Sequence, residues 1–211
     1  MTEGSGPRRT AQIFDAALYL LAERGYEGLT IEGVAERAGV NKTTIYRWWP
    51  SKAALLGAAL IDAPRLRFAV PNTGSLHGDL TALARALVKL LTEPPSAALA
   101  IAALGAATQN AELAAYARDF FSNRLATELP IFVRAAKRGE LSAEAADPML
   151  VMDALAGAVW VRVVLRQLPV DADFADRLAS LLLAGAGGAR GQDSCPVETA
   201  GPEPTTPCCR R

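Results

Sequence analysis

The sequence predicts an all-α protein of about nine helices. Apolar residues recur at helical spacing along most of the 211 residues, and no segment alternates apolar and polar residues over a useful length. Glycine, proline and asparagine separate the periodic segments. Hydrophobic residues make up 51% of the chain, which is enough to form a core in one or two domains.

Four helices are expected near the N-terminus. The first runs from Thr10, a possible cap, to Gly25, a residue suited to ending a helix. The next three are predicted over residues 30–38, 41–48 and 52–63. A glycine follows the second helix and a Pro-Ser pair separates the third from the fourth, so each of these helices has a local stop signal.

Five further helices are expected after a loop at residues 71–75, whose proline, asparagine, glycine and serine favour turns. Their predicted ranges are 76–92, 96–108, 111–138, 147–167 and 171–184. Pro130 lies inside the third range, where we expect a kink or a break. The chain then divides into a flexible arm (1–9), a first domain (10–65), a second domain (66–186) and a disordered tail (187–211).

Composition excludes several classes of protein. Lysine plus arginine equals aspartate plus glutamate at 22 each, so the chain is not a uniformly basic coat for nucleic acid. All three cysteines lie in the tail and His77 is the single histidine, so we expect no disulfide scaffold, no metal site, no cofactor and no histidine-based triad. The longest uncharged run has only residues 97–107 continuously apolar, and no signal peptide is readable. We therefore expect a cytoplasmic protein that binds no membrane.

The stretch from Thr30 to Lys52 is the most informative. Two short helices that cross steeply need a small residue where they touch and a turn residue that tolerates a positive φ. Ala35 and Gly39 have these properties at a separation of four residues. Ile45, six residues after the glycine, then packs the second helix against the first. This spacing is that of a helix-turn-helix of about 20 residues.

The opposite face of the second helix is polar and cationic. With Ile45 inward, Thr43 and Arg47 point outward, and the 25 residues between Glu36 and Asp62 contain four cations and no acid. A local basic strip of this kind is expected where a protein contacts phosphates. The alternative is an ordinary helical hairpin with a solvated basic face, but the interleaved aromatic residues favour the first interpretation.

Residues 25–55 resemble the DNA-binding domain of the tetracycline-repressor (TetR) family of bacterial transcriptional regulators. The segment reads G-Y-E-G-L-T-I-E-G-V-A-E-R-A-G-V-N-K-T-T-I-Y-R-W-W-P-S-K-A-A-L, and its most specific part is T-I-Y-R-W-W-P-S-K. The resemblance is strong over about residues 10–65. It implies an N-terminal three-helix helix-turn-helix DNA-binding domain, followed by a larger helical ligand-binding and dimerisation domain.

The resemblance also implies roles for single residues in DNA binding. Positions that usually contact the phosphate backbone in this family are occupied by Thr30, Tyr46, Trp48 and Lys52. Positions that read or approach base edges are occupied by Asn41, Lys42, Thr43, Thr44 and Arg47. Trp49 is expected to pack in the core of the small domain.

The last two predicted helices carry stripes of small and aliphatic residues. The resemblance implies that they pair with their copies in a four-helix bundle, whereas packing within one protomer is the alternative explanation of the stripes. The predicted dimer-interface residues are Ala154, Gly157, Ala158, Val161, Leu178, Leu181 and Leu182.

The alanine-rich helices that precede them leave space between their axes, so we expect them to form the walls of a ligand cavity. The residues predicted to line this cavity are Tyr116, Phe120 and Trp160. These aromatic residues would serve equally well as plain core residues. Gln109 and Arg124 fit either a polar contact with a ligand or an exposed surface.

These patterns lead to one functional hypothesis and one alternative. The hypothesis is a homodimeric transcriptional repressor that binds a palindromic operator in double-stranded DNA and is released by a small, largely apolar effector. The sequence does not distinguish repression from activation. The alternative is an all-α small-molecule-binding protein or enzyme that retains a helix-turn-helix. No nucleophile and base can be paired from the sequence, so an enzyme is not expected.

Overall fold

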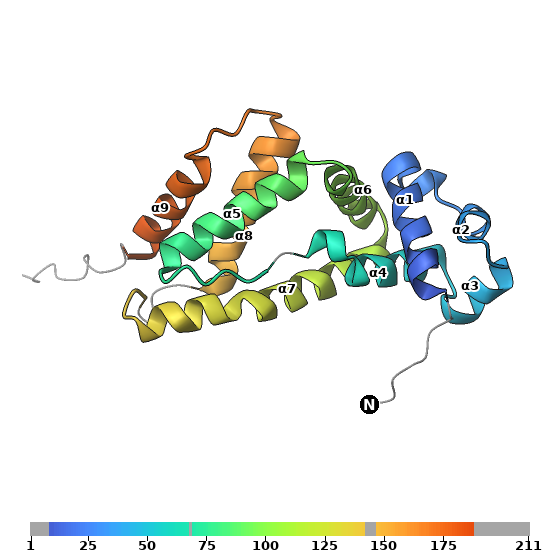
Figure 1. Ribbon diagram of the computed structural model, residues 1–211, viewed down its shortest axis with the longest axis horizontal. Coiled ribbons are helices and arrows are strands. Elements are labelled where there is room, and N and C mark those ends of the chain that lie inside the picture. The colour runs from blue at the N-terminus through green and yellow to red at the C-terminus, as the bar shows by residue number, and fades with distance from the viewer. Residues whose placement is uncertain (1–8, 68, 142–146, 188–211) are drawn as a thin grey trace, which may run out of the picture.

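A computed structural model of the chain describes residues 9–67, 69–141 and 147–187, and these residues form nine α-helices and no strand (Figure 1). The helices are α1 (Thr10–Gly28), α2 (Ile31–Ala38), α3 (Lys42–Trp48), α4 (Lys52–Asp62), α5 (Leu76–Thr92), α6 (Ser96–Gln109), α7 (Ala111–Lys137), α8 (Pro148–Trp160) and α9 (Phe174–Gly187). A 3-10 turn, η1 (Pro64–Leu66), follows α4, and a π-helical turn, η2 (Val161–Leu165), follows α8. The predicted all-α class is confirmed.

Helices α1 to α3 gather at one end of the molecule, and α5 to α9 form the larger body (Figure 1). Helix α4 connects the two and packs on α7, while α1 packs on α6. Buried apolar side chains form one connected cluster that extends from Ile13 in α1 to Ala179 in α9. The two parts of the chain therefore share a continuous core.

Most helices end close to the predicted stop signals. Gly25 has a φ of 68° and interrupts α1, which resumes for one short turn up to Gly28. Helix α9 begins at Phe174 and not at residue 171, because Asp171 Oδ1 accepts a hydrogen bond from the Asp173 backbone N–H at 3.1 Å and holds a turn there. The predicted helix over 147–167 changes to π-helical winding after Trp160.

The break that the sequence predicts at Pro130 does not occur, because α7 continues to Lys137. Proline cannot donate to the carbonyl four residues earlier, which is that of Ala126. Both Ala126 and Pro130 are exposed, so water can hydrate this carbonyl on the outer side of the helix. The helix thus runs the length of the body in one piece (Figure 1).

The arm and the tail fall almost entirely outside the described residues. Residues 1–8 of the predicted arm and 188–211 of the predicted tail, which includes the three cysteines, are not among them. Gly187 is the last residue of α9. Arg9 is the one residue of the predicted arm that the structure describes.

Candidate DNA-binding surface, ligand cavity and dimer face

Local hydrogen bonds shape the turn between α2 and α3. Thr30 Oγ1 accepts from the Gly33 N–H at 3.1 Å and caps α2. Asn41 Oδ1 caps α3 by accepting from the backbone N–H of Thr43 at 3.0 Å and from its hydroxyl at 2.9 Å. Between the two helices Gly39 has a φ of 62°, a left-handed conformation that favours glycine. The predicted helix-turn-helix geometry is therefore present.

The core of this small unit also agrees with the spacing in the sequence. Ile45 and Val34 are fully buried, and Ala35 is 6% exposed. The ring of Trp49 lies 5.2 Å from that of Phe14 in α1, measured between centroids. The expectation that Trp49 packs in the core is confirmed, because its ring joins α1 to the end of α3.

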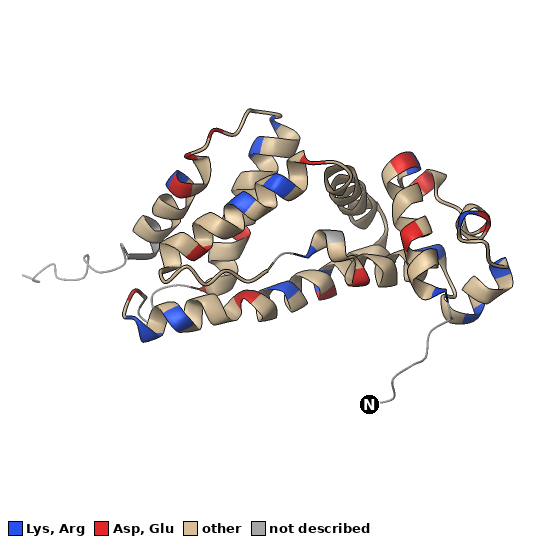
Figure 2. Cartoon of the chain, viewed as in Figure 1, with Lys and Arg blue, Asp and Glu red and all other residues tan. Residues whose placement is uncertain are grey.

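The opposite face of α3 is open to solvent. Tyr46 and Trp48 are 48% and 43% exposed, and Lys42, Thr43 and Arg47 are exposed as well. Thr44 is half-buried on the flank. We call the five exposed residues the recognition surface. Figure 2 shows lysine and arginine on α3, which has no acidic residue.

Two lysines among the predicted DNA contacts already have partners within the protein. Lys42 Nζ lies 3.4 Å from Glu32 Oε1 across an exposed ion pair, which contributes little to stability. A backbone hydrogen bond and the contact with Lys42 hold the pKa of Glu32 below its usual value. Lys52 Nζ donates to the Tyr26 carbonyl at 2.8 Å and lies 4.0 Å from the centre of the Tyr26 ring. An ammonium has three donors, so Lys52 is positioned by α1 and keeps donors for phosphate.

Arg9 is a residue that the sequence assigned to the arm and that the structure ties to the turn. Its Nη1 donates to the Gly39 carbonyl at 2.8 Å. Arg37 in α2 stacks over the Tyr19 ring at 3.4 Å from its centre, so this cation of the basic strip takes part in packing. Helix caps and periodicity give no signal for either contact, since both depend on how α1 and α2 meet.

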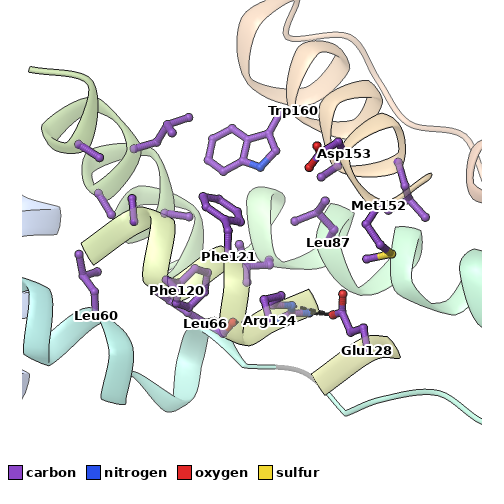
Figure 3. Close-up of a pocket in the computed structure, with 18 of the residues that line it drawn as sticks. Leu60, Leu66, Leu87, Phe120, Phe121, Arg124, Glu128, Met152, Asp153 and Trp160 are labelled. Atoms are coloured by element: carbon purple, nitrogen blue, oxygen red, sulfur yellow. Dashed lines mark hydrogen bonds and ion pairs between the residues drawn. The ribbon is translucent and has the colours of Figure 1, made fainter. Parts of the chain in front are cut away.

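A cavity of about 200 Å³ lies in the body, bounded by α4, η1 and α5 to α8 (Figure 3). Tyr116, Phe120 and Trp160 line it, as the sequence predicts. Arg124 also lines it, whereas Gln109 is exposed and is not among the lining residues. Apart from Arg124 and two acidic residues, the described side chains around the cavity are uncharged and mostly aliphatic or aromatic.

An ion pair is buried in the cavity wall. Arg124 Nε donates to Glu128 Oε1 at 2.6 Å, and Glu128 is 2% exposed. Burial raises the pKa of Glu128, although the charge of Arg124 opposes this shift. Glu128 could not be identified as a cavity residue from the sequence, because an acid four residues after an arginine usually forms an exposed helix pair.

Tyr116 connects the cavity to α4. A Cβ atom at Gly57 in α4 would lie only 2.3 Å from carbon atoms of the Tyr116 ring, so the ring occupies the space that any side chain at this position would need. Ser51 at the start of α4 also donates from its hydroxyl to Glu112 Oε1 in α7 at 2.8 Å. The helix that follows α3 is therefore held directly against the cavity wall.

The predicted dimer residues divide between an exposed face and the core. Leu181 and Val161 are 70% and 44% exposed, and Ala154 and Gly157 are exposed. Ala158 and Leu182 are half-buried.

The prediction that Leu178 lies in the dimer face is corrected. Leu178 is 7% exposed and packs in the protomer core, because α9 lies on α5. Leu150 and Leu165 are not among the predicted interface residues, yet they are 66% and 75% exposed.

Several large apolar residues of α8 and η2 are exposed, namely Met149, Leu150, Val161 and Leu165. The window Pro148–Leu165 is long and apolar enough to cross a membrane by length and composition alone, and 11% of it is buried. Asp153 and Arg162 lie in this segment, so it does not stand out in the sequence as an uncharged run. A helix in a protomer with so little of its apolar surface covered needs another apolar surface to contact.

Comparison with known proteins gives consistent matches along the chain. A family model described as bacterial regulatory proteins, tetR family, matches residues 13–59, and one described as the tetracyclin repressor-like C-terminal domain matches residues 70–182. The HTH-type transcriptional regulator AqdR of Rhodococcus erythropolis is 30% identical over 180 residues, which cover 85% of this chain and 86% of AqdR.

Two further proteins extend the comparison. The DNA-binding transcriptional repressor TetR of Mycobacteroides abscessus is 43% identical over 79 residues, or 36% of this chain and 41% of that protein. Among solved structures, the TetR family transcription regulator SCO0332 is similar with a TM-score of 0.68 and 34% identity, over 85% of this chain and 98% of the other.

Proposed function

Because this chain belongs to the tetracycline-repressor family of helix-turn-helix transcriptional regulators, we propose that it is a homodimeric repressor released from its operator by a small, largely apolar effector. Members of the family bind operator DNA, dimerise and bind small-molecule effectors. The family consists of regulators and not of enzymes, so the alternative of a helical enzyme is not favoured. The observation that carries the proposal is the recognition surface, exposed on α3 opposite the buried Ile45.

In the proposed complex, α3 enters the major groove of double-stranded DNA. Arg47 has the planar, two-pronged donor set that binds the acceptors of guanine. The residues proposed to read or approach base edges are Asn41, Lys42, Thr43, Thr44 and Arg47. The residues proposed to contact phosphates are Thr30, Tyr46, Trp48 and Lys52. Phosphate contacts fix the register of the helix, and base contacts supply the specificity.

The proposed dimer buries the exposed face of α8, η2 and α9 against the same face of a second copy. Support comes from the exposure of Leu150, Leu165 and Leu181, each at least 66%, and from Gly157, where a Cβ would meet no atom within 4 Å in the protomer. Two-fold symmetry then places two α3 helices about 34 Å apart, one turn of DNA. The operator of such a dimer is an inverted repeat, and the site of action is the cytoplasm.

The effector is proposed to bind in the cavity and to act through α4. A ligand that displaces Tyr116 changes the fit of this ring against Gly57, and α4 begins only four residues after the end of α3. The ligand shifts the protein towards a form whose α3 helices are misplaced for DNA. The size of this shift is limited by the difference in ligand affinity between the two forms.

The proposal is tested by selecting DNA from a random duplex pool with the full-length protein. We expect an inverted repeat with half-sites one helical turn apart, protected together in footprinting. The selected duplex then serves in an effector screen by fluorescence anisotropy. Selection of no common sequence, or of a single half-site bound by one protomer, would contradict the proposed function.

A further inference from the structure

We propose that the effector is a neutral, largely apolar molecule with one hydrogen-bond donor, a hydroxyl or an N–H group, and that this donor binds Glu128. The inference rests on the proposed function, because it takes the cavity as the effector site. The hydrogen bond to Glu128 is the contact that would select this ligand among other apolar molecules.

Glu128 is a buried carboxylate with an unused acceptor. It lies in α7 and is 2% exposed. Its Oε1 accepts from Arg124 Nε at 2.6 Å, whereas its Oε2 is buried and has no hydrogen-bond partner among the residues that the structure describes. Buried acceptors in native proteins are nearly always satisfied. A donor on a bound ligand satisfies this one.

The surroundings of Glu128 favour an apolar ligand body. Of the described side chains that line the cavity, only Arg124, Glu128 and Asp153 carry a charge, and Asp153 is exposed. Figure 3 shows Glu128 and Arg124 side by side in the wall, with Leu60 towards the other end of the cavity. The terminal torsion of a glutamate is soft, so a small rotation of the carboxylate presents Oε2 to the cavity.

The ion pair also favours a ligand without charge. A ligand carboxylate would face Glu128, and a ligand ammonium would face Arg124, in an apolar environment where like charges repel strongly. Arg124 Nη1 is anchored by a hydrogen bond to the Leu66 carbonyl at 3.3 Å, which ties the guanidinium to η1. Burial raises the pKa of Glu128, because the charged carboxylate loses its hydration in the cavity wall. A neutral hydrogen-bond donor on the ligand replaces part of that hydration without adding a charge.

Three probes of similar size separate these possibilities: β-naphthol, which donates a hydrogen bond, its methyl ether, which cannot, and β-naphthoate, which is anionic. Their binding to the full-length protein is measured by isothermal titration calorimetry. We expect β-naphthol to bind roughly 10-fold more tightly than the ether, and β-naphthoate to bind most weakly.

The variant Glu128→Gln tests the assignment to this residue. A glutamine oxygen accepts from Arg124, which leaves the amide N–H group facing the cavity as a donor. We therefore expect the preference for β-naphthol over its ether to fall to about one in this variant. Asp119→Asn is the matched control, because Asp119 is an exposed acid of α7 that does not line the cavity. This control is expected to keep the native preference.

The outcomes distinguish this inference from the proposed function. Equal binding of β-naphthol and its ether to the native protein would overturn the inference, and release of operator DNA by either probe would leave the proposed function standing. Tightest binding of β-naphthoate would assign the ligand contact to Arg124 and also overturn it. Binding of none of the probes would count against the cavity as the effector site, and thus against both.

Discussion

The helix-turn-helix and the cavity region are built from the same kind of element but are packed to different densities. In the helix-turn-helix, Ile45 and Val34 are fully buried, and the side-chain caps and Gly39 fix both ends of α2 and the start of α3. In the body, α5 to α8 leave about 200 Å³ unfilled between them and bury an ion pair in the wall. Recognition of a DNA sequence requires that the recognition helix is held in one position. Ligand binding requires an unfilled volume and surrounding helices that can move.

The largest expected effect tests the packing difference directly. Ile45→Ala removes a fully buried side chain and is expected to lower the free energy of unfolding by about 2–5 kcal/mol. Leu87→Ala in the cavity wall is the control, and it is expected to cost less, because Leu87 is half-buried and already borders empty space. Urea denaturation of both variants checks the comparison. Equal losses would show that the two regions are packed alike.

A second change tests the proposed dimer face formed by α8, η2 and α9. Gly157→Leu is expected to overpack a close helix contact between protomers by about 1–3 kcal/mol and to yield monomers in sedimentation velocity. Gly105→Leu is a matched control, because a Cβ at either glycine meets no atom within 4 Å in the protomer and Gly105 lies on α6, outside the proposed interface. A dimer of unchanged stability in the Gly157 variant would place the interface elsewhere.

A third change tests the recognition surface of the helix-turn-helix. Arg47→Ala is expected to weaken binding to the selected operator by about 1–3 kcal/mol and to relax its sequence preference. The reason is that a lost base contact affects the matched site more than random DNA. Arg85→Ala, an exposed arginine on α5, serves as the control. Anisotropy titrations against operator and random duplexes measure both quantities, and a uniform loss on both would reassign Arg47 to phosphate contact.

The smallest expected effect concerns the contact between the two regions. Gly57→Ala is expected to push Tyr116 aside and to change the ligand's effect on operator affinity by about 0.5–2 kcal/mol, because the added Cβ would lie 2.3 Å from the ring. The pair Gly57→Ala and Tyr116→Leu forms a double-mutant cycle. If the smaller side chain at position 116 does not restore the native response, this contact does not transmit the signal.

The helix-turn-helix could be predicted because its requirements are local. Gly39 supplies the turn, Ala35 the close contact and Ile45 the buried anchor, and their spacing follows from the geometry of two short helices. The aromatic residues of the cavity could also be placed, since the alanine-rich helices around them leave space that larger side chains would fill.

The polar part of the cavity could not be predicted, because it depends on contacts distant in sequence. The spacing of Arg124 and Glu128 is that of an exposed helix pair, and only the packing of other helices around α7 buries it. Leu178 illustrates the same limit, since a stripe of aliphatic residues on α9 does not reveal which side faces α5 and which faces a second protomer. Periodicity shows that a face is apolar but not what covers it.

The contact of Gly57 with Tyr116 has a consequence for how this sequence can diverge. The two positions share one volume, so a larger residue at 57 requires a smaller one at 116. Among relatives that keep this helix packing, the sizes of the two residues are expected to vary inversely. A lineage that acquires a new effector by a substitution at position 116 is then expected to carry a compensating substitution in α4, at a buried position that does not line the cavity.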